Sequence, residues 1–369
     1  MKSIIESLKK SDKFADFIVP VDEQTEFRDA TYFLRRDGIF AFAEGYCHEF
    51  DRPLVERHVV SHLVFVPQVG EIPDDSKKQL FGRPYENITK GIMSTQPLHL
   101  FYPLQLKRYL EIDPSLDVAK PVYARYKVLV PVDSFVGHFP HLRSMKTIFE
   151  RGDGGDRSAL RIKKAIHASA DLLGISPGQI GISGSLSLGT YESPHDLDVV
   201  IYATVKEVRR IVDFIYTLTA TREERKVFEF GKFWPLRFWE LFGGDKLMIC
   251  PFFSYRNLDE CPLRDFTCEE LAKVKLEGRV CDHTHNAYNP TMVILENVKI
   301  DDRSYSGNLR LILYHGGERG DYVEGDHVAG DASHVVIRTF KGEGQERKQV
   351  EEYEAVLTTS IGDVKKVGD

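Results

Sequence analysis

The stretch from residue 181 to 202, GISGSLSLGTYESPHDLDVVIY, constrains this chain more than any other part of it. It opens with a turn of small residues and closes with an apolar run typical of a buried strand. Because side chains alternate faces along a strand, Asp196 and Asp198 are predicted to emerge on one side, two positions apart. Two carboxylates beside a Gly-Ser turn suit a metal-bound triphosphate, since Mg²⁺ prefers hard oxygen ligands. Gly184 would let the backbone approach a phosphate, and Ser185 would offer a hydroxyl and an N–H.

This order of residues resembles the signature of the nucleotidyltransferase fold, the DNA polymerase beta superfamily. The likeness rests on Gly184-Ser185, Gly189-Thr190 and the acid pair that leads into Val-Val-Ile. The surrounding chain resembles archaeal and bacterial predicted nucleotidyltransferases of that superfamily, more loosely at 37–40 and 45–48. A compound motif of this kind is far more specific than a bare Asp-x-Asp.

The resemblance implies transfer of a nucleoside monophosphate from an NTP to a hydroxyl acceptor, with release of pyrophosphate and with Mg²⁺ or Mn²⁺ as cofactor. Asp196 and Asp198 would be metal ligands and catalytic residues. The acceptor would be RNA, DNA or a protein hydroxyl. The nucleotide would be bound by a set of small residues in the turn and the loop after it: Gly184, Ser185, Gly189 and Thr190. His195 either contacts phosphate or caps the turn, and an exposed loop histidine favours the cap.

The third carboxylate of the family is missing from its expected strand. That strand is predicted over 246–253, where no acid occurs and something like Met248 takes the place. Asp245 at the mouth of the strand is the best substitute as a catalytic residue, and Glu240 is the next. The sequence therefore fits an active transferase and also a non-catalytic nucleotide or nucleic-acid binding module. A carboxylate from Asp245 or Glu240 beside the acid pair would favour the enzyme, and its absence would favour the module.

Length and periodicity predict an α+β protein of three consecutive parts: an N-terminal α+β region over 1–150, a central part over 151–265 and an OB-like small β-barrel over 266–369. The resemblance implies that the central part, 151–265, is a nucleotidyltransferase domain. The polar run at 151–156 would be the first joint. Helices are predicted over 104–111, 158–173 and 205–218, and a hairpin over 31–35 and 39–43. Further strands are predicted over 58–66, 123–130 and 246–253, and a loop over 70–84. Pro251 indicates that the last of these strands lies at a sheet edge or that the strand ends there. Five short strands follow over 274–280, 291–298, 309–314, 335–340 and 353–359.

Composition excludes some classes of protein. A net charge of −7 gives no whole-chain basic field for nucleic acid, and the barrel turns are acidic. Five scattered cysteines and no apolar run of membrane-spanning length predict a cytoplasmic protein with reduced thiols and no membrane partner.

Two groups of histidine and cysteine residues have spacings that only partly match metal sites. His58 and His62 have helical spacing, but their segment is β-branched enough to be a strand. A second set lacks the usual cysteine spacing: Cys261, Cys268, Cys281, His283 and His285. Cys250 and Cys281 are interpreted as buried thiols. The aromatic residues between 228 and 242 are interpreted as core, with Lys226, Lys232 and Arg237 as the basic contacts to a triphosphate or acceptor.

Overall fold

The computed structural model describes residues 8, 12–46, 49, 52–68, 70–72, 74–191, 196–342 and 344–368. The chain combines helices and strands, as the sequence predicts, and it divides into two compact units. Unit 1 consists of Met1–Ala43, Val64–Asn87 and Ser134–Arg256, and unit 2 of Glu44–Leu63, Ile88–Asp133 and Asn257–Asp369. None of the described helices is both long and apolar enough to cross a membrane.

These units differ from the three consecutive domains expected. The first 150 residues contribute to both units, so they form no domain of their own. The expected joint at 151–156 consists of the last residues of α5 (His141–Asp153) and the tight turn that leads into α6 (Arg157–Leu173). The side chain of Asp156 caps α6 by accepting a hydrogen bond from the N–H of Ala159 at 3.1 Å. This glycine-rich polar run therefore caps and connects two packed helices, and it is not a linker between domains.

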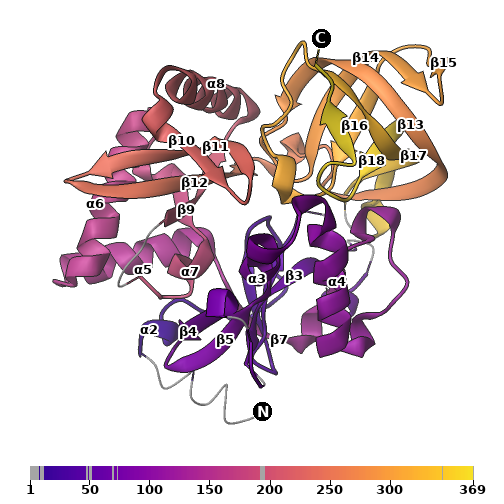
Figure 1. Cartoon of the computed structure of the whole chain (residues 1–369). Helices are drawn as coiled ribbons and strands as arrows, with labels where there is room; N and C mark the ends of the chain where they lie inside the picture. The colour runs from indigo at the N-terminus through magenta and orange to yellow at the C-terminus, as the bar shows by residue number, and fades with distance from the viewer. Residues whose placement is uncertain are drawn as a thin grey trace. The chain divides into compact units, whose positions relative to one another are not determined.

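The central sheet of unit 1 has the order β10-β11-β12-β9-β8 (Figure 1). The pair β9–β12 is parallel and the other neighbours are antiparallel. The bounds of these strands are Ile180–Ile182 for β8, Asp196–Ala203 for β9, Lys226–Glu229 for β10, Lys232–Phe242 for β11 and Asp245–Tyr255 for β12.

The helices predicted around this sheet are confirmed. The apolar stripe of α6 is buried, and the helix ends at Gly174, whose φ of 64° is the left-handed conformation that glycine adopts easily. α8 (Val205–Thr221) follows β9, and α6 and α8 both pack against β11. The short helix α7 (Gly184–Ser187) lies between β8 and β9.

In the strand order β12 lies between β11 and β9, but the expectation that Pro251 marks a sheet edge or a strand end is confirmed at Pro251 itself, where β12 has a partner on one side only. The pairing with β11 covers only Asp245–Ile249. Beyond Ile249, β12 continues beside β9 alone, so Pro251 interrupts no ladder on the β11 side.

Unit 1 also contains the predicted hairpin, β1 (Tyr32–Arg35) and β2 (Phe40–Ala43), with β7 (Phe135–Phe139) on the other side of β1. The loop expected over 70–84 is wrong for its second half, because β4 (Lys77–Leu80) and β5 (Arg83–Asn87) form a hairpin there; the described residues from 70 to 76 belong to no strand. Its residues are polar because β4 is largely exposed, which gives the sequence of a loop. The small helix α2 covers Asp12–Ala15.

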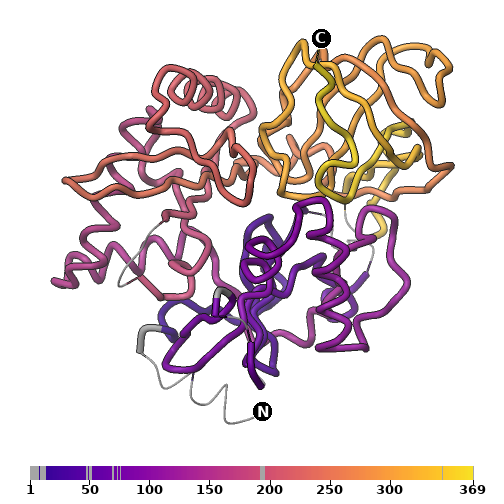
Figure 2. The backbone as a smooth tube through the Cα atoms, in the orientation of Figure 1, coloured from indigo at the N-terminus to yellow at the C-terminus, as the bar shows by residue number. Residues whose placement is uncertain are grey.

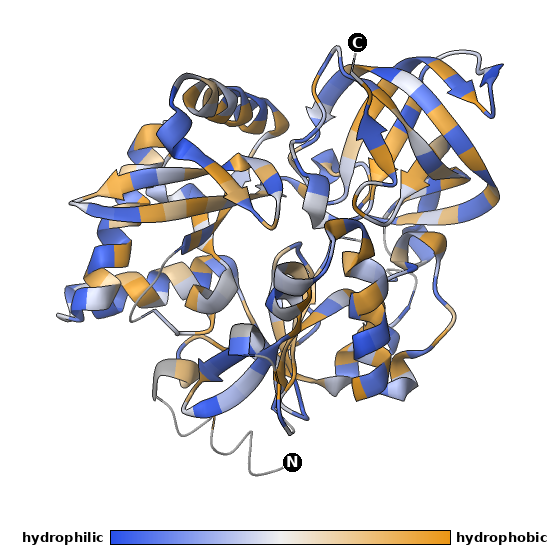
Figure 3. Cartoon of the chain, in the orientation of Figure 1, coloured by the Kyte–Doolittle hydropathy of each residue, from blue (hydrophilic) through white to orange (hydrophobic). Residues whose placement is uncertain are grey.

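In unit 2, five strands pair in a closed cycle, β13-β14-β16-β18-β17 and back to β13. Their colours run from orange to yellow in the trace of Figure 2. The long strands alternate hydrophobic and hydrophilic bands in Figure 3, as expected when one face is buried. The bounds are Phe266–His285 (β13), Thr291–Ile300 (β14), Leu309–Leu313 (β16), His327–Lys341 (β17) and Lys348–Thr358 (β18), with β15 (Arg303–Ser304) on β14 and β19 (Val364–Lys366) on β17. The five predicted strands are confirmed, although β13 and β17 are longer than expected.

The earlier segments of unit 2 complete its core. They carry α3 (Ile88–Thr95), α4 (Phe101–Ile112) and β6 (Val128–Pro131), the last pairing with the first half of β3 (His58–Pro67). Tyr123, predicted in a strand, lies in a 3-10 turn, and its ring centroid is 5.0 Å from that of Tyr314.

Candidate metal centre

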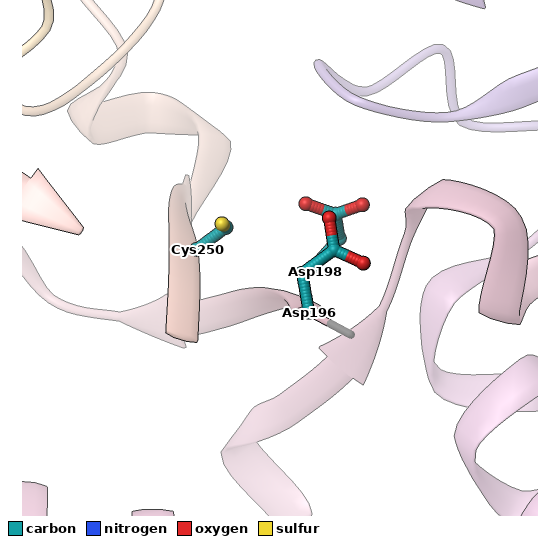
Figure 4. Close-up of side chains that lie close together, drawn as sticks. All are labelled: Asp196, Asp198 and Cys250. Atoms are coloured by element: carbon teal, nitrogen blue, oxygen red, sulfur yellow. The ribbon is translucent and has the colours of Figure 1, made fainter. Parts of the chain in front are cut away.

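Two carboxylates project from the start of β9. Asp196 and Asp198 are separated by one residue of a regular strand, so they lie on the same face of the sheet, and both are partly exposed. Figure 4 shows the two side chains pointing to the same side. The buried residues between and after them, beginning with Leu197 and Val199, hold the strand in the sheet. The sequence prediction of a same-face acid pair is confirmed.

Cys250 is the third potential ligand at this place. In the parallel register of β12 and β9, Cys250 lies opposite Asp198, and Met248 opposite Asp196. One ligand atom from each of Asp196, Asp198 and Cys250 lies within 4.8 Å of the other two. The sulfur in Figure 4 points to the side of the carboxylates. Sequence reasoning missed this residue, because the register between two strands about fifty residues apart decides which side chain meets the acids.

The protonation of this thiol follows from its surroundings. Burial raises the pKa of Cys250 well above its ordinary value, Arg237 opposes that shift, and Asp198 and Asp196 add to it. The side chain is 4% exposed. In the absence of a cation the group is therefore a neutral thiol.

The Gly-Ser turn contacts the acid pair directly. Gly184 has a φ of 60°, and a Cβ built on it would overlap the carboxylate of Asp198. The N–H of Ser183 donates to the carbonyl oxygen of Asp198 at 2.9 Å, and its hydroxyl donates to the carbonyl of Ala30 at 2.6 Å. Only glycine fits at position 184, because the backbone there approaches the Asp198 carboxylate; the expected approach to a phosphate stays a prediction.

The loop after the turn folds back on Ser185. The hydroxyl of Thr190 donates to the carbonyl oxygen of Ser185 at 2.7 Å, and the N–H of Thr190 reaches the same oxygen at 3.2 Å. Gly189, with a φ of 83°, makes the reversal possible. The structure thus brings Gly184, Ser185, Gly189 and Thr190 into one turn, with the Ser185 side chain partly exposed.

Tyr191 anchors the end of this loop. Its hydroxyl accepts from Arg151 at 3.0 Å and donates to Asp156 at 3.0 Å, which ties the loop to the turn between α5 and α6. His195 and the three residues before it lie outside the described residues, so neither interpretation of that histidine is tested.

Asp245 and Glu240, the acids expected to complete the site, do not join the group of Asp196 and Asp198. Asp245, at the first position of β12, forms an ion pair with Arg161 at 2.6 Å. It precedes Met248 by three strand positions, about 10 Å along the strand. Glu240 is held by Arg225 and lies opposite Leu247. The prediction of Asp245 as a third carboxylate of the group is therefore wrong, and Cys250 takes that position.

Two further residues lie near the centre: Tyr32, which no sequence pattern indicated, and Arg237, one of the predicted basic contacts. Tyr32, on β1, is buried, and burial raises the pKa of its phenol, with Asp198 and Asp196 adding to the shift. Arg237 on β11 donates to Glu229 at 2.6 Å, and its guanidinium lies 4.1 Å from the Trp234 ring centroid. Tyr32 comes from an element distant in sequence, and no local motif marks it.

The aromatic residues of β10 and β11 are partly core. Phe238 is fully buried and Trp234 nearly so, as interpreted, but Phe228 is 65% exposed. The basic side chains between them lie over rings: Lys226 over Phe233 and Lys232 over Trp234.

The carboxylates of Asp196 and Asp198 and the thiol of Cys250 determine which metal ion this site can hold. Two carboxylates on one face fit Mg²⁺ or Mn²⁺, with the remaining positions left for phosphate and water oxygens. A thiol does not fit a second Mg²⁺, because a hard cation prefers oxygen. The residues present therefore fit one hard cation at the acid pair but depart from the three-carboxylate pattern of the family.

The weaker metal patterns do not assemble. His58 and His62 lie in β3, the predicted strand, and are paired with Glu49 and Glu44 respectively. His283 accepts from the N–H of Glu324 at 3.1 Å. Within the part of the chain that the structure describes, no group of three histidine, cysteine or acidic residues other than Asp196, Asp198 and Cys250 is close enough to hold an ion.

Comparison of the chain with family models, with curated proteins and with solved structures found no match.

Proposed function

We propose that unit 1 is a nucleotidyltransferase that moves a nucleoside monophosphate from an NTP to a hydroxyl acceptor and releases pyrophosphate. The observation that carries this proposal is the contact of the Gly184 turn with the carboxylate of Asp198, on the face where Asp196 also emerges. A triphosphate with its cation needs these two features side by side.

In this proposal each residue has a stated role. Asp196 and Asp198 hold Mg²⁺ or Mn²⁺, which when bound would neutralise phosphate charge and orient the reacting groups. The turn of Gly184 and Ser185 faces the phosphates, and Thr190 fixes the carbonyl of Ser185 so that the turn keeps its shape. Arg237 is a cation on the same sheet that can balance negative charge near the acids.

The arrangement of elements supports the finer fold assignments. The order helix, turn, acid strand, helix, strand expected of a small nucleotidyltransferase domain matches α6, α7, β9, α8 and β12. In unit 2, the closed cycle of five strands with a parallel β16–β18 pair supports an OB-like small barrel. The acceptor, whether RNA, DNA or a protein hydroxyl, is left open by both assignments.

A second candidate is a nucleotide or nucleic-acid binding module without catalysis. The observation that favours it is the position of Asp245 and Glu240, each bound to an arginine and neither part of the acid group. Without a third carboxylate, binding would survive while the acceptor hydroxyl would lose activation.

The test uses the full chain with each α-³²P-labelled NTP, Mg²⁺ or Mn²⁺, and a mixed RNA and protein acceptor pool. The Asp196→Ala/Asp198→Ala variant removes both acids, and Asp213→Asn, on α8, serves as a matched acidic control. Label transfer by wild type and the control, lost in the double variant, is the expected result. Metal-dependent NTP binding without transfer, lost in the same variant, would favour the module. Absence of NTP binding would contradict the assignment of a nucleotide site to Asp196 and Asp198.

A further inference from the structure

We propose that Asp196, Asp198 and Cys250 together form a three-ligand site for a thiophilic divalent cation of the Zn²⁺ or Co²⁺ type, with the Cys250 sulfur as a direct ligand. The inference rests on the proposed function, since it names the ion preferred at that same site. It goes beyond that function because the family pattern of three carboxylates gives no reason to expect sulfur.

The first argument is geometric. Three ligand atoms, two carboxylate oxygens and one sulfur, lie within 4.8 Å of one another. They come from two adjacent parallel strands in register, with Cys250 directly opposite Asp198. Because both strands belong to the middle of one sheet, the positions of the ligands are fixed by backbone pairing rather than by a loop.

The second argument is the state of the thiol. Cys250 is 4% exposed, it is a free cysteine, and the structure gives it no hydrogen bond to any described residue. Its sulfur nevertheless points to the side of the two partly exposed carboxylates (Figure 4). A buried sulfur placed beside two oxygen ligands is an arrangement that a cation can use.

The third argument is the chemistry of the donor set. Mg²⁺ takes oxygen ligands in a near-ideal octahedron, whereas Zn²⁺ and Co²⁺ accept thiolate and carboxylate together in a four-coordinate site. Three protein ligands leave one position for a phosphate or water oxygen. On binding, the metal–sulfur bond replaces the S–H bond, and the thiol proton passes to solvent.

The test is a titration of the metal-free full chain with Co²⁺, followed by absorption. A sulfur ligand produces near-ultraviolet charge transfer from thiolate to cobalt, which oxygen ligands do not. The expected result is that wild type shows this absorption with one equivalent of Co²⁺ and that Zn²⁺ displaces it. Cys250→Ser should lose the absorption, and its Co²⁺ affinity should fall at least about tenfold, since even hydrogen-bond partners of metal ligands matter that much. Cys281→Ser, a free thiol in unit 2, is the matched control and should behave as wild type.

A second variant keeps the test decisive if serine disturbs the sheet. Cys250→Asp supplies a third carboxylate, so it should lose the charge-transfer band while its Mg²⁺ affinity, measured by calorimetry, rises at least about tenfold. Circular dichroism verifies the fold of each variant. An unchanged cobalt spectrum in Cys250→Ser, or equal Mg²⁺ affinity in wild type and Cys250→Asp, would overturn the inference.

The two proposals fail separately. If the cobalt–sulfur absorption is absent but Mg²⁺-dependent NTP binding depends on Asp196 and Asp198, the proposed function stands and this inference falls. If the absorption is present but no NTP binds under any metal, the metal site stands without the transferase.

Discussion

At the scale of single residues, Gly184 is the position where the candidate site tolerates the least change. Gly184→Ala would place a methyl group on the carboxylate of Asp198, at a φ of 60° that alanine adopts only with strain. We expect metal-dependent NTP binding to weaken by roughly tenfold or more, because a ligand must move. Equilibrium binding with a fluorescent NTP analogue measures the effect.

The control for backbone strain is Gly231→Ala. Gly231 has a similar φ of 73°, but nothing lies within 4 Å of the added Cβ. This variant should show the strain alone and bind nucleotide as wild type does. Equal binding losses in the two variants would refute the steric explanation.

A buried histidine makes unit 1 sensitive to acid. Burial, with smaller contributions from the neighbouring Arg28 and His138 and against an opposing hydrogen bond to the backbone of Ala30, lowers the pKa of His141 to about 4. The neutral ring bonds to the hydroxyl of Tyr202 at 2.8 Å. Since an unfolded histidine titrates near pH 6.5, the unfolded chain binds more protons between about pH 6.5 and 4. The stability that depends on the neutral ring is therefore complete above that range and is lost as the pH falls through it.

Replacement of the His141 imidazole isolates the contribution of its titration to the free energy of unfolding. His141→Gln lacks the titration, so the difference in free energy of unfolding between wild type and variant should shrink by roughly 3 kcal/mol from pH 7 to pH 4. Urea denaturation at a series of pH values measures it. A difference that stays constant with pH would contradict the assignment of a neutral buried ring.

At the scale of elements, α8 depends on its first turn. The side chains of Thr204 and Glu207 form a capping box: Glu207 donates its N–H to the threonine hydroxyl at 3.3 Å, and its carboxylate accepts from the N–H of Thr204 at 2.8 Å. Thr204→Ala should lower the free energy of unfolding by about 1 kcal/mol. Thr221→Ala, at the exposed far end of the same helix, should cost less than about 0.5 kcal/mol. Urea unfolding curves of the two variants provide the comparison, and equal losses would exclude the cap as the cause.

The elements also show what the sequence reveals and what it does not. Helices α6 and α8 and the hairpin β1–β2 were predicted because their signals are local: apolar spacing, caps and an Asp-Gly turn. The β4–β5 hairpin was missed because polar, exposed strands resemble loops.

At the site, the acid pair and the turn are contiguous in sequence and were found together. Cys250 was not found with them. It lies two residues beyond Met248 on the same strand, and the register between β12 and β9, which no local pattern encodes, decides which of the two lies opposite Asp198.

At the scale of the whole molecule, the closed cycle of strands in unit 2 depends on earlier parts of the chain. Its core includes Val60, Tyr123 and Leu129 together with Tyr314 and Ile337. Residues 257–369 alone would therefore expose apolar surface that these segments cover. We expect this fragment to lack a cooperative unfolding transition, measured by near-ultraviolet circular dichroism with the full chain as reference. A cooperative transition with native aromatic signals would show that the cycle of strands is self-sufficient.

The segments of the two units alternate along the chain, which affects the order in which each unit is completed during synthesis. The polypeptide changes unit after Ala43, Leu63, Asn87, Asp133 and Arg256. During synthesis, unit 2 lacks most of its strands until the final third of the chain leaves the ribosome, so its early segments wait for their partners. In the gene, no single contiguous piece encodes either unit. The shortest contiguous piece that carries the acid pair with all of unit 1, residues 1–256, therefore also carries two early segments of unit 2 without the strands that they pack against.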